Sequence, residues 1–346
     1  MLGRRMVVTL FWAVGCSLSM SCSNEGATIP SDVVPEPAST VAVGDYLGQE
    51  SPGRVPVIFA RGIVSTGMAE RDVAITPDLQ EIYFTRVIGE FSASAIMVTR
   101  RMGQEWSKPE VASFSGVYKD LEPAISPDGK RFFYISIRPK EGSEALAESE
   151  DIWVADRVED GWSEPQNLGP PVNSEHAEFF PSVTEEGTLY FTRRGEGTTE
   201  NIFRSRLEGG VYQEPEQLGP EVNSGKTQFN AYVSPEESFI VVCVWGRDDS
   251  QGSTDYYVSF RDSNDSWTGP FNLGLEINTS GAREYSPYVS PDGKYFFFMS
   301  SRTELGEDVQ SEPFTARSLE ELHNTPGNGN SDIYWIEAGI LEELRP

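Results

Sequence analysis

The sequence is poor in cysteine and in basic residues, and each shortage excludes a class of protein. Only three cysteines occur in 346 residues, and Cys16 and Cys22 both lie near the N-terminus, so no disulfide framework can form in the rest of the chain. The third, Cys243, lies in the apolar run FIVVCVW, which predicts a buried thiol. Lysine and arginine total 27 against 54 acidic residues, and the net charge of −27 argues against nucleic acids and anionic membrane surfaces as partners.

Familiar catalytic motifs are missing as well. The two histidines, His176 and His323, lie far apart in the sequence, and neither has a cysteine partner outside an apolar run. The sequence contains no G-x-S-x-G, no H-E-x-x-H, no Walker loop and no dinucleotide fingerprint. We therefore expect no catalytic residues and no metal site of a recognisable pattern.

The first 22 residues have the features of an export signal. Arg4 and Arg5 precede the apolar run MVVTLFWAVG, which is too short to span a bilayer stably. The stretch resembles a bacterial lipoprotein signal, with Cys16 or Cys22 as the lipidated residue. The resemblance implies an exported protein held at the cell envelope, as an outer-membrane lipoprotein facing the periplasm or the exterior. A cleaved signal peptide or an uncleaved anchor is the alternative. Residues 23–50 are rich in Pro, Ser, Thr and acids, which predicts a disordered tether.

Two stretches far apart are nearly the same: LEPAISPDGKRFFYISIR at 121–138 and YSPYVSPDGKYFFFMSSR at 285–302. Shorter relatives occur at 74–86, 182–193 and 232–247. Aligned on the Ser or Thr before each turn, the five repeats are 50, 58, 50 and 56 residues apart. Periods of this length are typical of β-propeller blades.

Each repeat predicts four strands, A to D. A short apolar strand A leads to a Pro-Asp-Gly turn and an aromatic strand B, then to an alternating strand C and a strand D containing proline. The fifth repeat has no strand D, whereas VPVIFARGIV (55–64) precedes the first strand A without a blade of its own. We therefore predict an all-β, five-bladed β-propeller of four-stranded antiparallel blades over residues 51–346, with the ring closed by the N-terminal strand.

The repeat W-x-x-P-x-x-L-G-x-x-[IV]-N-S, followed by [DE]-x-x-P-x-x-S-P-D-G-x-x-x-[FY]-F-x-S-x-R, closely resembles the Pro-Asp-repeat (WD-repeat-like) β-propellers typified by TolB. The resemblance recurs five times over about residues 55–346. It implies the propeller fold, but propellers host unrelated functions, so the function has to be argued from a site. TolB has six blades and a separate N-terminal domain, whereas this sequence shows five repeats.

One polar position recurs at the start of every strand A. In repeat order, these residues are Glu70, Asp120, Glu178, Gln228 and Glu284. We expect them to ring the mouth of the central channel, on the face that the B–C loops share. Acidic residues of those loops include Glu141, Glu144, Glu148, Glu150, Asp248, Asp249, Glu304, Glu307, Asp308 and Glu312. The hypothesis is a mouth that binds a cation, with Ca²⁺ the one cofactor considered, or a positively charged peptide.

A structural interpretation competes with this ligand-binding hypothesis. Strand B ends on the same face with one arginine per repeat: Arg86, Arg138, Arg193 or Arg194, Arg247 and Arg302. Acid and arginine, once per blade, indicate ion pairs that stitch blades together. In the third repeat we expect Arg194 to be the partner.

The sequence as a whole favours a non-catalytic binding or scaffolding propeller at the envelope. Its expected partner is an envelope protein or peptide, or else a glycan, at the face with the strand A starts and the B–C loops; no nucleic acid is expected, and membrane association is through an N-terminal lipid only. The alternative is a glycan-active hydrolase or lyase that uses carboxylates at the mouth. The stretch SLEELHN (318–324) predicts a short helix on that face.

Overall fold

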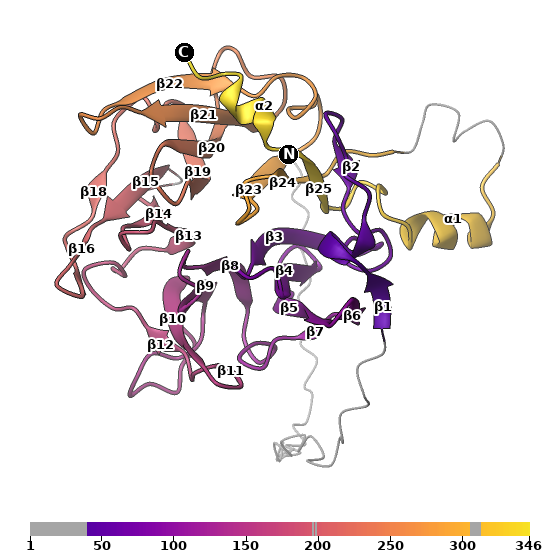
Figure 1. Ribbon diagram of the computed structural model, residues 1–346, viewed down its shortest axis with the longest axis horizontal. Helices are drawn as coiled ribbons and strands as arrows, with labels where there is room; N and C mark the ends of the chain where they lie inside the picture. The colour runs from indigo at the N-terminus through magenta and orange to yellow at the C-terminus, as the bar shows by residue number, and fades with distance from the viewer. Residues whose placement is uncertain (1–39, 196, 198, 305–312) are drawn as a thin grey trace, which may run out of the picture. The chain divides into compact units, whose positions relative to one another are not determined.

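The computed structural model describes residues 40–195, 197, 199–304 and 313–346. Five antiparallel sheets stand in a ring, which confirms the five-bladed β-propeller (Figure 1). Blades 1 to 5 are numbered along the chain. Their innermost strands, A, are β3 (Ala69–Ile75), β8 (Asp120–Ile125), β13 (Glu178–Val183), β19 (Thr227–Val233) and β23 (Glu284–Val289). No helix within the described residues is long and apolar enough to cross a membrane.

Strands B and C form the middle of every blade. The aromatic and β-branched strands B are β4 (Glu81–Ile88), β9 (Arg131–Ser136), β14 (Leu189–Arg194), β20 (Phe239–Trp245) and β24 (Tyr295–Ser300). Strands C are β5 (Ala93–Met102), β10 (Asp151–Val158), β15 (Glu200–Ser205), β21 (Asp255–Arg261) and β25 (Asp332–Glu337). Because strand B lies between A and C and its side chains alternate between two sheet faces, both faces pack on neighbouring blades.

Short strands form the outer edges. They are β6 (Glu105–Ser107) and β7 (Glu110–Val111) in blade 1, β11 (Gly161–Trp162) and β12 (Gln166–Asn167) in blade 2, β18 (Glu216–Gln217) in blade 3 and β22 (Trp267–Asn272) in blade 4. A small hairpin of β16 (Leu207–Glu208) and β17 (Val211–Tyr212) extends blade 3. Short, proline-rich edges limit pairing with other chains.

The N-terminal strand closes the ring, as predicted. β2 (Val57–Ile58) pairs with β25, Val57 opposite Trp335 and Ile58 opposite Tyr334, and so supplies the missing strand D of blade 5. The next residue, Phe59, is fully buried and lies 5.1 Å, ring centroid to ring centroid, from both Phe297 and Trp335. Blade 5 is therefore built from both ends of the described chain.

The structure differs from the predicted tether at its C-terminal end. β1 (Thr40–Val43) pairs with β6 and extends blade 1, and the 3-10 turn η1 (Asp45–Gly48) follows it. Tyr46 and Leu47 are buried, and the Tyr46 hydroxyl donates to Asp292 Oδ1 at 2.8 Å. The burial of these two side chains holds the segment against the propeller, although the neighbouring residues in the sequence have the composition of a disordered tether. The signal segment, Cys16, Cys22 and the rest of the tether lie outside the described residues.

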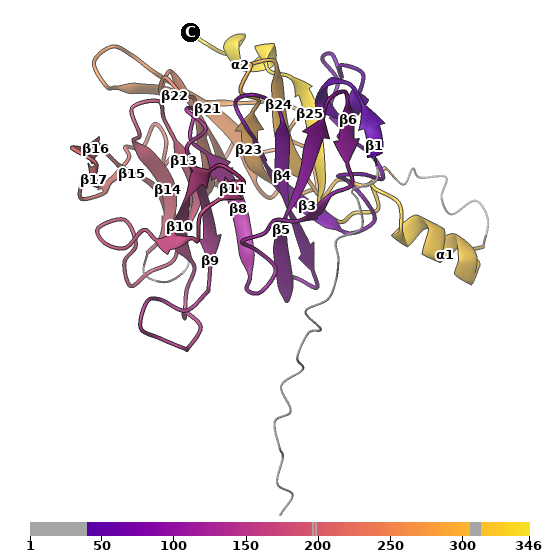
Figure 2. The ribbon, with the colours of Figure 1, turned by 60° about the horizontal axis from the view of Figure 1, so that its bottom comes forward.

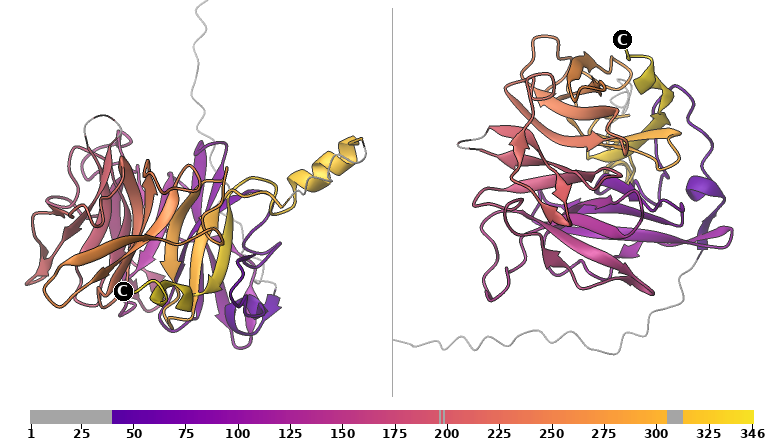
Figure 3. Two further views of the ribbon diagram at one scale, coloured as in Figure 1. Left: turned by 90° about the horizontal axis from the view of Figure 1, so that it is seen from above. Right: turned by 60° about the vertical axis from the view of Figure 1, so that its left-hand side comes forward.

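Two short helices occur in the C-terminal part of the described chain. α1 (Ala316–His323) begins at a capping box formed by Thr315 and Ser318, and it confirms the helix expected at 318–324. α1 has no buried residue and stands apart from the sheets (Figures 1 and 3). α2 (Gly339–Glu342) follows β25 and buries Leu341. The loop acids Glu307, Asp308 and Glu312 lie outside the described residues.

The two faces of the ring differ. The loop face carries the strand A starts and the described parts of the B–C connections, at residues 89–92, 137–150, 195, 197, 199, 246–254, 301–304 and 313–331. The turn face carries the A–B turns, at residues 76–80, 126–130, 184–188, 234–238 and 290–294. Figure 2 shows the blades from the side, with their strands running from one face to the other. Cys243 is fully buried within blade 4, as expected.

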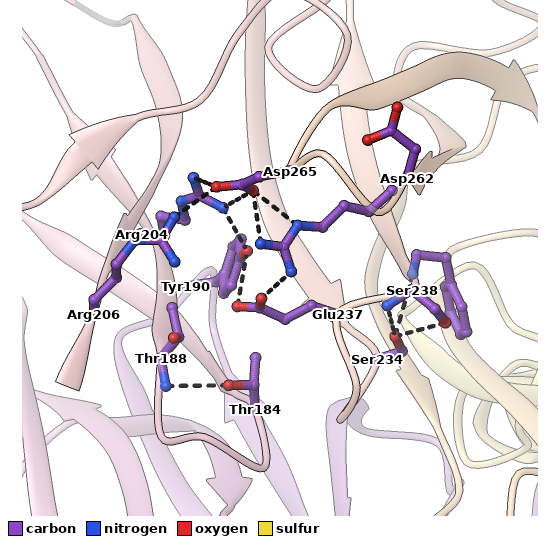
Figure 4. A network of polar contacts seen from close by, with 12 residues as sticks. Thr184, Thr188, Tyr190, Arg204, Arg206, Ser234, Glu237, Ser238, Asp262 and Asp265 are labelled. Atoms are coloured by element: carbon purple, nitrogen blue, oxygen red, sulfur yellow. Dashed lines mark hydrogen bonds and ion pairs between the residues drawn. The ribbon is translucent and has the colours of Figure 1, made fainter. Parts of the chain in front are cut away.

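Polar clamps join neighbouring blades at the turn face. Arg204 of blade 3 binds Asp265 of blade 4, and Arg261 binds both Asp265 and Glu237 (Figure 4). The Tyr190 hydroxyl of blade 3 donates to Glu237 at 3.2 Å, so side chains of both blades converge on one network. Similar contacts join blades 1 and 2, where Arg157 binds Glu81 and the Trp162 indole donates to the Tyr83 hydroxyl. These contacts join neighbouring blades and stabilise the ring at the turn face.

Candidate functional site

The five polar residues predicted to ring the mouth are inside the protein. All five lie at the start of their strands A on the loop face, as expected, yet none is more than 2 % exposed. Their oxygens accept hydrogen bonds from the connection that leads into the same strand. Glu70 accepts from the backbone N–H and the hydroxyl of Thr66, at 3.0 and 2.6 Å, and Glu178 from Ser174 in the same way, at 3.0 and 2.5 Å. Asp120 and Glu284 accept from Ser115 and Thr279.

Arginines from strand B complete four of these sites. The nitrogen–oxygen distances are 3.0 Å for Arg86–Glu70, 3.0 Å for Arg138–Asp120, 2.7 Å for Arg193–Glu178 and 4.0 Å for Arg302–Glu284. In each pair, acid and arginine belong to the same blade. Glu70 and Glu178 face their arginines directly across strands A and B. Arg138 and Arg302 lie two residues beyond Ser136 and Ser300, the residues that face Asp120 and Glu284. The arginines also donate to backbone carbonyls of the incoming connection: Val64, Phe114, Val172 and Ile277. The pairs therefore hold the D–A connection in place and do not link side chains of two blades.

Two arginine assignments were wrong. In blade 3 the partner of Glu178 is Arg193, whereas Arg194, one residue later, points to the other sheet face and binds Glu200 at 3.1 Å. In blade 4, Arg247 binds Asp249 at 2.9 Å instead of Gln228. The neutral Gln228 needs no counterion, and its amide donates to the Glu200 carbonyl and to Asn201 Oδ1.

A ring that the sequence analysis did not identify lies deeper in the channel. Every strand A has a β-bulge immediately after its first residues, where its register with strand B shifts. The bulged residues have positive φ although none is glycine: Asp72 (53°), Glu122 (58°), Phe180 (51°), Asn230 (51°) and Ser286 (66°). Such backbone strain costs energy and is most often retained at functional sites, where a bulge redirects a side chain.

Arg71 fills the centre of this inner ring. Its Nε donates to both carboxylate oxygens of Asp72 at 2.8 Å, and its Nη2 donates to Glu122 Oε1 at 2.7 Å and to Ser286 Oγ at 3.2 Å. The guanidinium carbon lies 4.5 Å from the ring centroid of Tyr285. Arg71, Asp72 and Glu122 are all buried, so three charged groups from blades 1 and 2 meet inside the channel.

The environment of Glu122 favours its neutral form. Burial raises the pKa of the Glu122 carboxyl to about 8, Asp72 adds to the increase, and Arg71 opposes it. Glu122 Oε2 also accepts from the Phe180 backbone N–H at 2.7 Å. The cluster of Arg71, Asp72 and Glu122 consequently carries little net charge near neutral pH.

A cavity of about 510 Å³ opens above this cluster on the loop face. The five residues that follow the buried acids line its floor: Arg71, Leu121, Phe179, Phe229 and Tyr285. Its walls include Trp245, Lys119, Arg283 and Glu150. We call this cavity the mouth. Four of the five floor positions are apolar or aromatic, and Arg71 alone among them is charged.

Two further cavities border the channel. One of about 960 Å³ lies next to the mouth, shares Arg71, Phe91, Arg283 and Tyr285 with it, and reaches His323 at the end of α1. Another, of about 190 Å³, opens on the turn face and is lined largely by proline, including Pro77, Pro127, Pro235 and Pro291. Among the described residues, no group of three or more His, Cys, Asp and Glu side chains is placed to hold a metal ion.

The signal for the mouth was present in the repeats. The residue after the strand A acid reads Arg71, Leu121, Phe179, Phe229 and Tyr285 along the chain, and the next one reads Asp72, Glu122, Phe180, Asn230 and Ser286. Residues that recur in every blade serve the fold, whereas a functional site uses positions where the blades differ. Comparing the repeats for differences, and not only for similarities, would have identified Arg71.

Comparisons with known proteins add the following. No family model and no curated protein matches the chain. Among solved structures, TolB from Acinetobacter baumannii is 15 % identical with a TM-score of 0.44, over 78 % of this chain and 57 % of that one. The GH43 endo-arabinanase from Bacillus licheniformis is 11 % identical with a TM-score of 0.42, over 85 % of this chain and 96 % of that one. The chain thus spans little more than half the length of the first of these two structures.

Proposed function

We propose that this protein is a non-catalytic binding propeller of the cell envelope, anchored by a lipid at Cys16 or Cys22, that takes its ligand or partner in the mouth on the loop face. The observation that carries the proposal is the mouth itself, an open cavity of about 510 Å³ at the centre of the ring. Trp245, 45 % exposed, and Phe91, 41 % exposed, present aromatic surface there. Exposed aromatic side chains around a concave site are typical of binding surfaces.

The charged groups below the mouth support binding over catalysis. Glycoside hydrolysis needs one carboxyl group as acid and a second as base or nucleophile, separated by about 5–10 Å. Asp72 and Glu122 both bind the same arginine, Arg71, in the floor of the mouth. The strand A acids are buried and bonded to the connections of their own blades. These carboxylates therefore stabilise the fold and position Arg71.

Site-specific crosslinking tests the proposal. A photoreactive amino acid is placed in the mouth at Phe91 or Trp245. The control positions are Val211, on the outer hairpin strand β17, and Val158, at the last residue of β10; both are exposed and line no part of the mouth. The purified protein is irradiated with envelope extract of its source organism. We expect the same crosslinked product from both mouth positions and none from the controls. Equal products from all four positions, or none from the mouth, would contradict the proposal.

A glycan-active enzyme is the second candidate, and Glu150 is the observation that favours it. Glu150 lines the mouth, and its carboxylate makes no hydrogen bond or ion pair within the described chain. Glu150 also contributes to the raised pKa of Glu122, and both carboxyl groups line the same cavity. Release of reducing ends from a panel of acidic and neutral polysaccharides, abolished in E150Q and E122Q and retained in E164Q, would establish this function instead.

A further inference from the structure

Arg71 still has hydrogen-bond donors to offer. Its side chain is 7 % exposed, yet within the described chain only Nε and Nη2 donate, whereas Nη1 makes no hydrogen bond. Arg71 lines both the mouth and the larger cavity beside it. A buried guanidinium with an unused nitrogen beside an open cavity can receive an acceptor from a ligand without moving.

The guanidinium is fixed before any ligand arrives. Asp72 and Glu122 bind its other nitrogens, Ser286 accepts a further hydrogen bond, and the rings of Tyr285 and Phe91 lie 4.5 and 5.5 Å from its central carbon. Because the rotamer is already set, binding at Nη1 incurs little loss of side-chain entropy.

Two more cations lie at the rim of the mouth. Arg283 is exposed and Lys119 is half-buried, and neither forms an ion pair with any described residue. Arg194 differs, because Glu200 neutralises it at 3.1 Å. In a chain of net charge −27, two unpaired cations beside Arg71 give the mouth a local charge opposite to that of the protein.

From this arrangement we propose that the mouth binds a carboxylate-bearing ligand, with the carboxylate on Arg71 Nη1 and beside Arg283 and Lys119, and with a planar or apolar body against Trp245 and Phe179. The inference rests on the proposed function and defines the chemistry of its ligand. Guanidinium groups match the planar carboxylate in geometry. The carboxylates of Asp72 and Glu150 offset part of the local positive charge, which suits a singly charged carboxylate better than a phosphate dianion.

Calorimetric titration of the purified full chain tests the inference. The probes are galacturonate, a sugar acid, and N-acetylphenylalanine, the end of a peptide chain, each beside its neutral counterpart, galactose or N-acetylphenylalanine amide. We expect at least one acid to bind about 10-fold more tightly than its neutral counterpart, since charge-assisted hydrogen bonds are about twice as strong as neutral ones. The acid that binds identifies the source of the carboxylate.

Surface variants locate the site without risk to folding. The double variant K119Q/R283Q should weaken acid binding by roughly 5- to 10-fold and leave the neutral counterpart unchanged, as expected for loss of two partly screened charges. R317Q, on the exposed helix α1, is the matched control and should bind like the parent protein. R71K, at a buried position and therefore checked first for an unchanged melting temperature, keeps the charge but removes Nη1, and it should weaken acid binding most.

Each other outcome overturns the inference. If neither acid binds at concentrations up to about 10 mM, any binding free energy is weaker than roughly −3 kcal/mol, and the mouth has no carboxylate site. If the neutral counterparts bind as tightly as the acids and W245A abolishes both, the mouth still binds ligands and only the carboxylate assignment fails. If the acids bind equally to K119Q/R283Q and R317Q, the site lies elsewhere. Absence of both titration heat and mouth crosslinks would remove the proposed function as well.

Discussion

Arg204 of blade 3 and Asp265 of blade 4 form a bidentate ion pair, with nitrogen–oxygen distances of 2.7 and 2.8 Å. Arg204 is almost fully buried, whereas the Asp265 side chain is 37 % exposed. Asp265 stands in the C–D turn with φ of 62°, so the turn presents its carboxylate to three arginines: Arg204, Arg206 and Arg261 (Figure 4). One side chain thus joins two blades.

The first prediction is that D265N destabilises the propeller by about 1 kcal/mol at pH 7, a figure that allows for solvent screening of this partly exposed group. Hydrogen bonds from Arg204 and Arg261 hold the pKa of Asp265 far below its usual range. Because the pKa of Asp265 is lower in the folded than in the unfolded protein, the ionised carboxylate stabilises the fold above the unfolded-state pKa of about 4. This stabilisation is lost as the pH falls. Urea unfolding should therefore show D265N and the parent converging at low pH.

D160N is the matched control for this prediction. Asp160 is exposed in the corresponding C–D turn of blade 2, and it makes no ion pair with a described residue. Equal losses in D160N and D265N would show that the turn, and not the clamp between blades, sets the stability.

The second prediction concerns Asp332, which is fully buried at the start of β25. Oδ2 accepts from the Gly327 backbone N–H at 2.7 Å, whereas Oδ1 has no partner within the described chain. Burial, with the nearby Glu70, raises the pKa of Asp332 to about 7. A raised folded-state pKa favours the neutral carboxyl, so the protein loses stability as the pH rises from about 4 to about 7.

D332N should remove this pH dependence. We expect the variant to be on the order of 1–3 kcal/mol more stable than the parent at pH 8 and about equal to it at pH 5. Asp255, the equivalent residue of blade 4, differs because Gln251, Gly252 and Asn272 donate to its two oxygens. D255N should therefore destabilise the protein at both pH values. Urea unfolding of both variants at pH 5 and 8 checks the contrast, and a D332N that is less stable at pH 8 would disprove it.

A third prediction tests the closure of the ring. F59A removes a fully buried ring that packs on Phe297 and Trp335, and should lower the free energy of unfolding by about 3–5 kcal/mol. V57A alters Val57 of the same segment, whose side chain is 41 % exposed, and should change the free energy of unfolding by less than about 0.5 kcal/mol. Thermal unfolding of the two variants gives the comparison. Similar losses in both would indicate that the strand, and not its anchor, closes the ring.

The fourth prediction concerns Gln228, the one neutral residue among the five buried polar residues at the strand A starts. The Gln228 amide donates to the Glu200 carbonyl at 2.9 Å and to Asn201 Oδ1 at 2.6 Å. Q228E would place a carboxylate against these two acceptors while Arg247 is paired with Asp249, and should cost about 3 kcal/mol. Q104E, an exposed change in the C–D turn of blade 1, should be nearly neutral. A Q228E variant as stable as Q104E would mean that Arg247 can leave Asp249 to neutralise the new charge.

The repeats predicted the architecture because strand residues serve the same packing in every blade. The closing strand at Val57–Ile58 followed from counting strands, since the fifth repeat lacked one. Tyr46 and Leu47 were not anticipated, because two buried apolar side chains in a polar segment leave too weak a pattern to distinguish from a tether.

The candidate site was harder to predict, for reasons of register. Neighbouring residues of a strand point to opposite sheet faces, so two adjacent arginines have different partners. Arg193 binds Glu178, whereas Arg194 binds Glu200. The bulge after the first residues of each strand A changes that alternation and turns Asp72 and Glu122 into the channel. The repeat pattern identifies the strand A acids because they serve the fold in nearly every blade. It does not identify Arg71, which occurs in one blade only.

The pairing of β2 with β25 imposes an order on biosynthesis. Val57 and Ile58 leave the ribosome long before Asp332–Glu337, so the first strand of the ring stays without its neighbours while four blades are made. Blades 2 to 4 take all their strands from contiguous sequence, and blade 1 is interrupted only by β2, so these four blades can assemble as they emerge. The ring is complete only when β25 is added. A chain that stops before Asp332 leaves β24 and β2 with unpaired edges, which can pair with other chains.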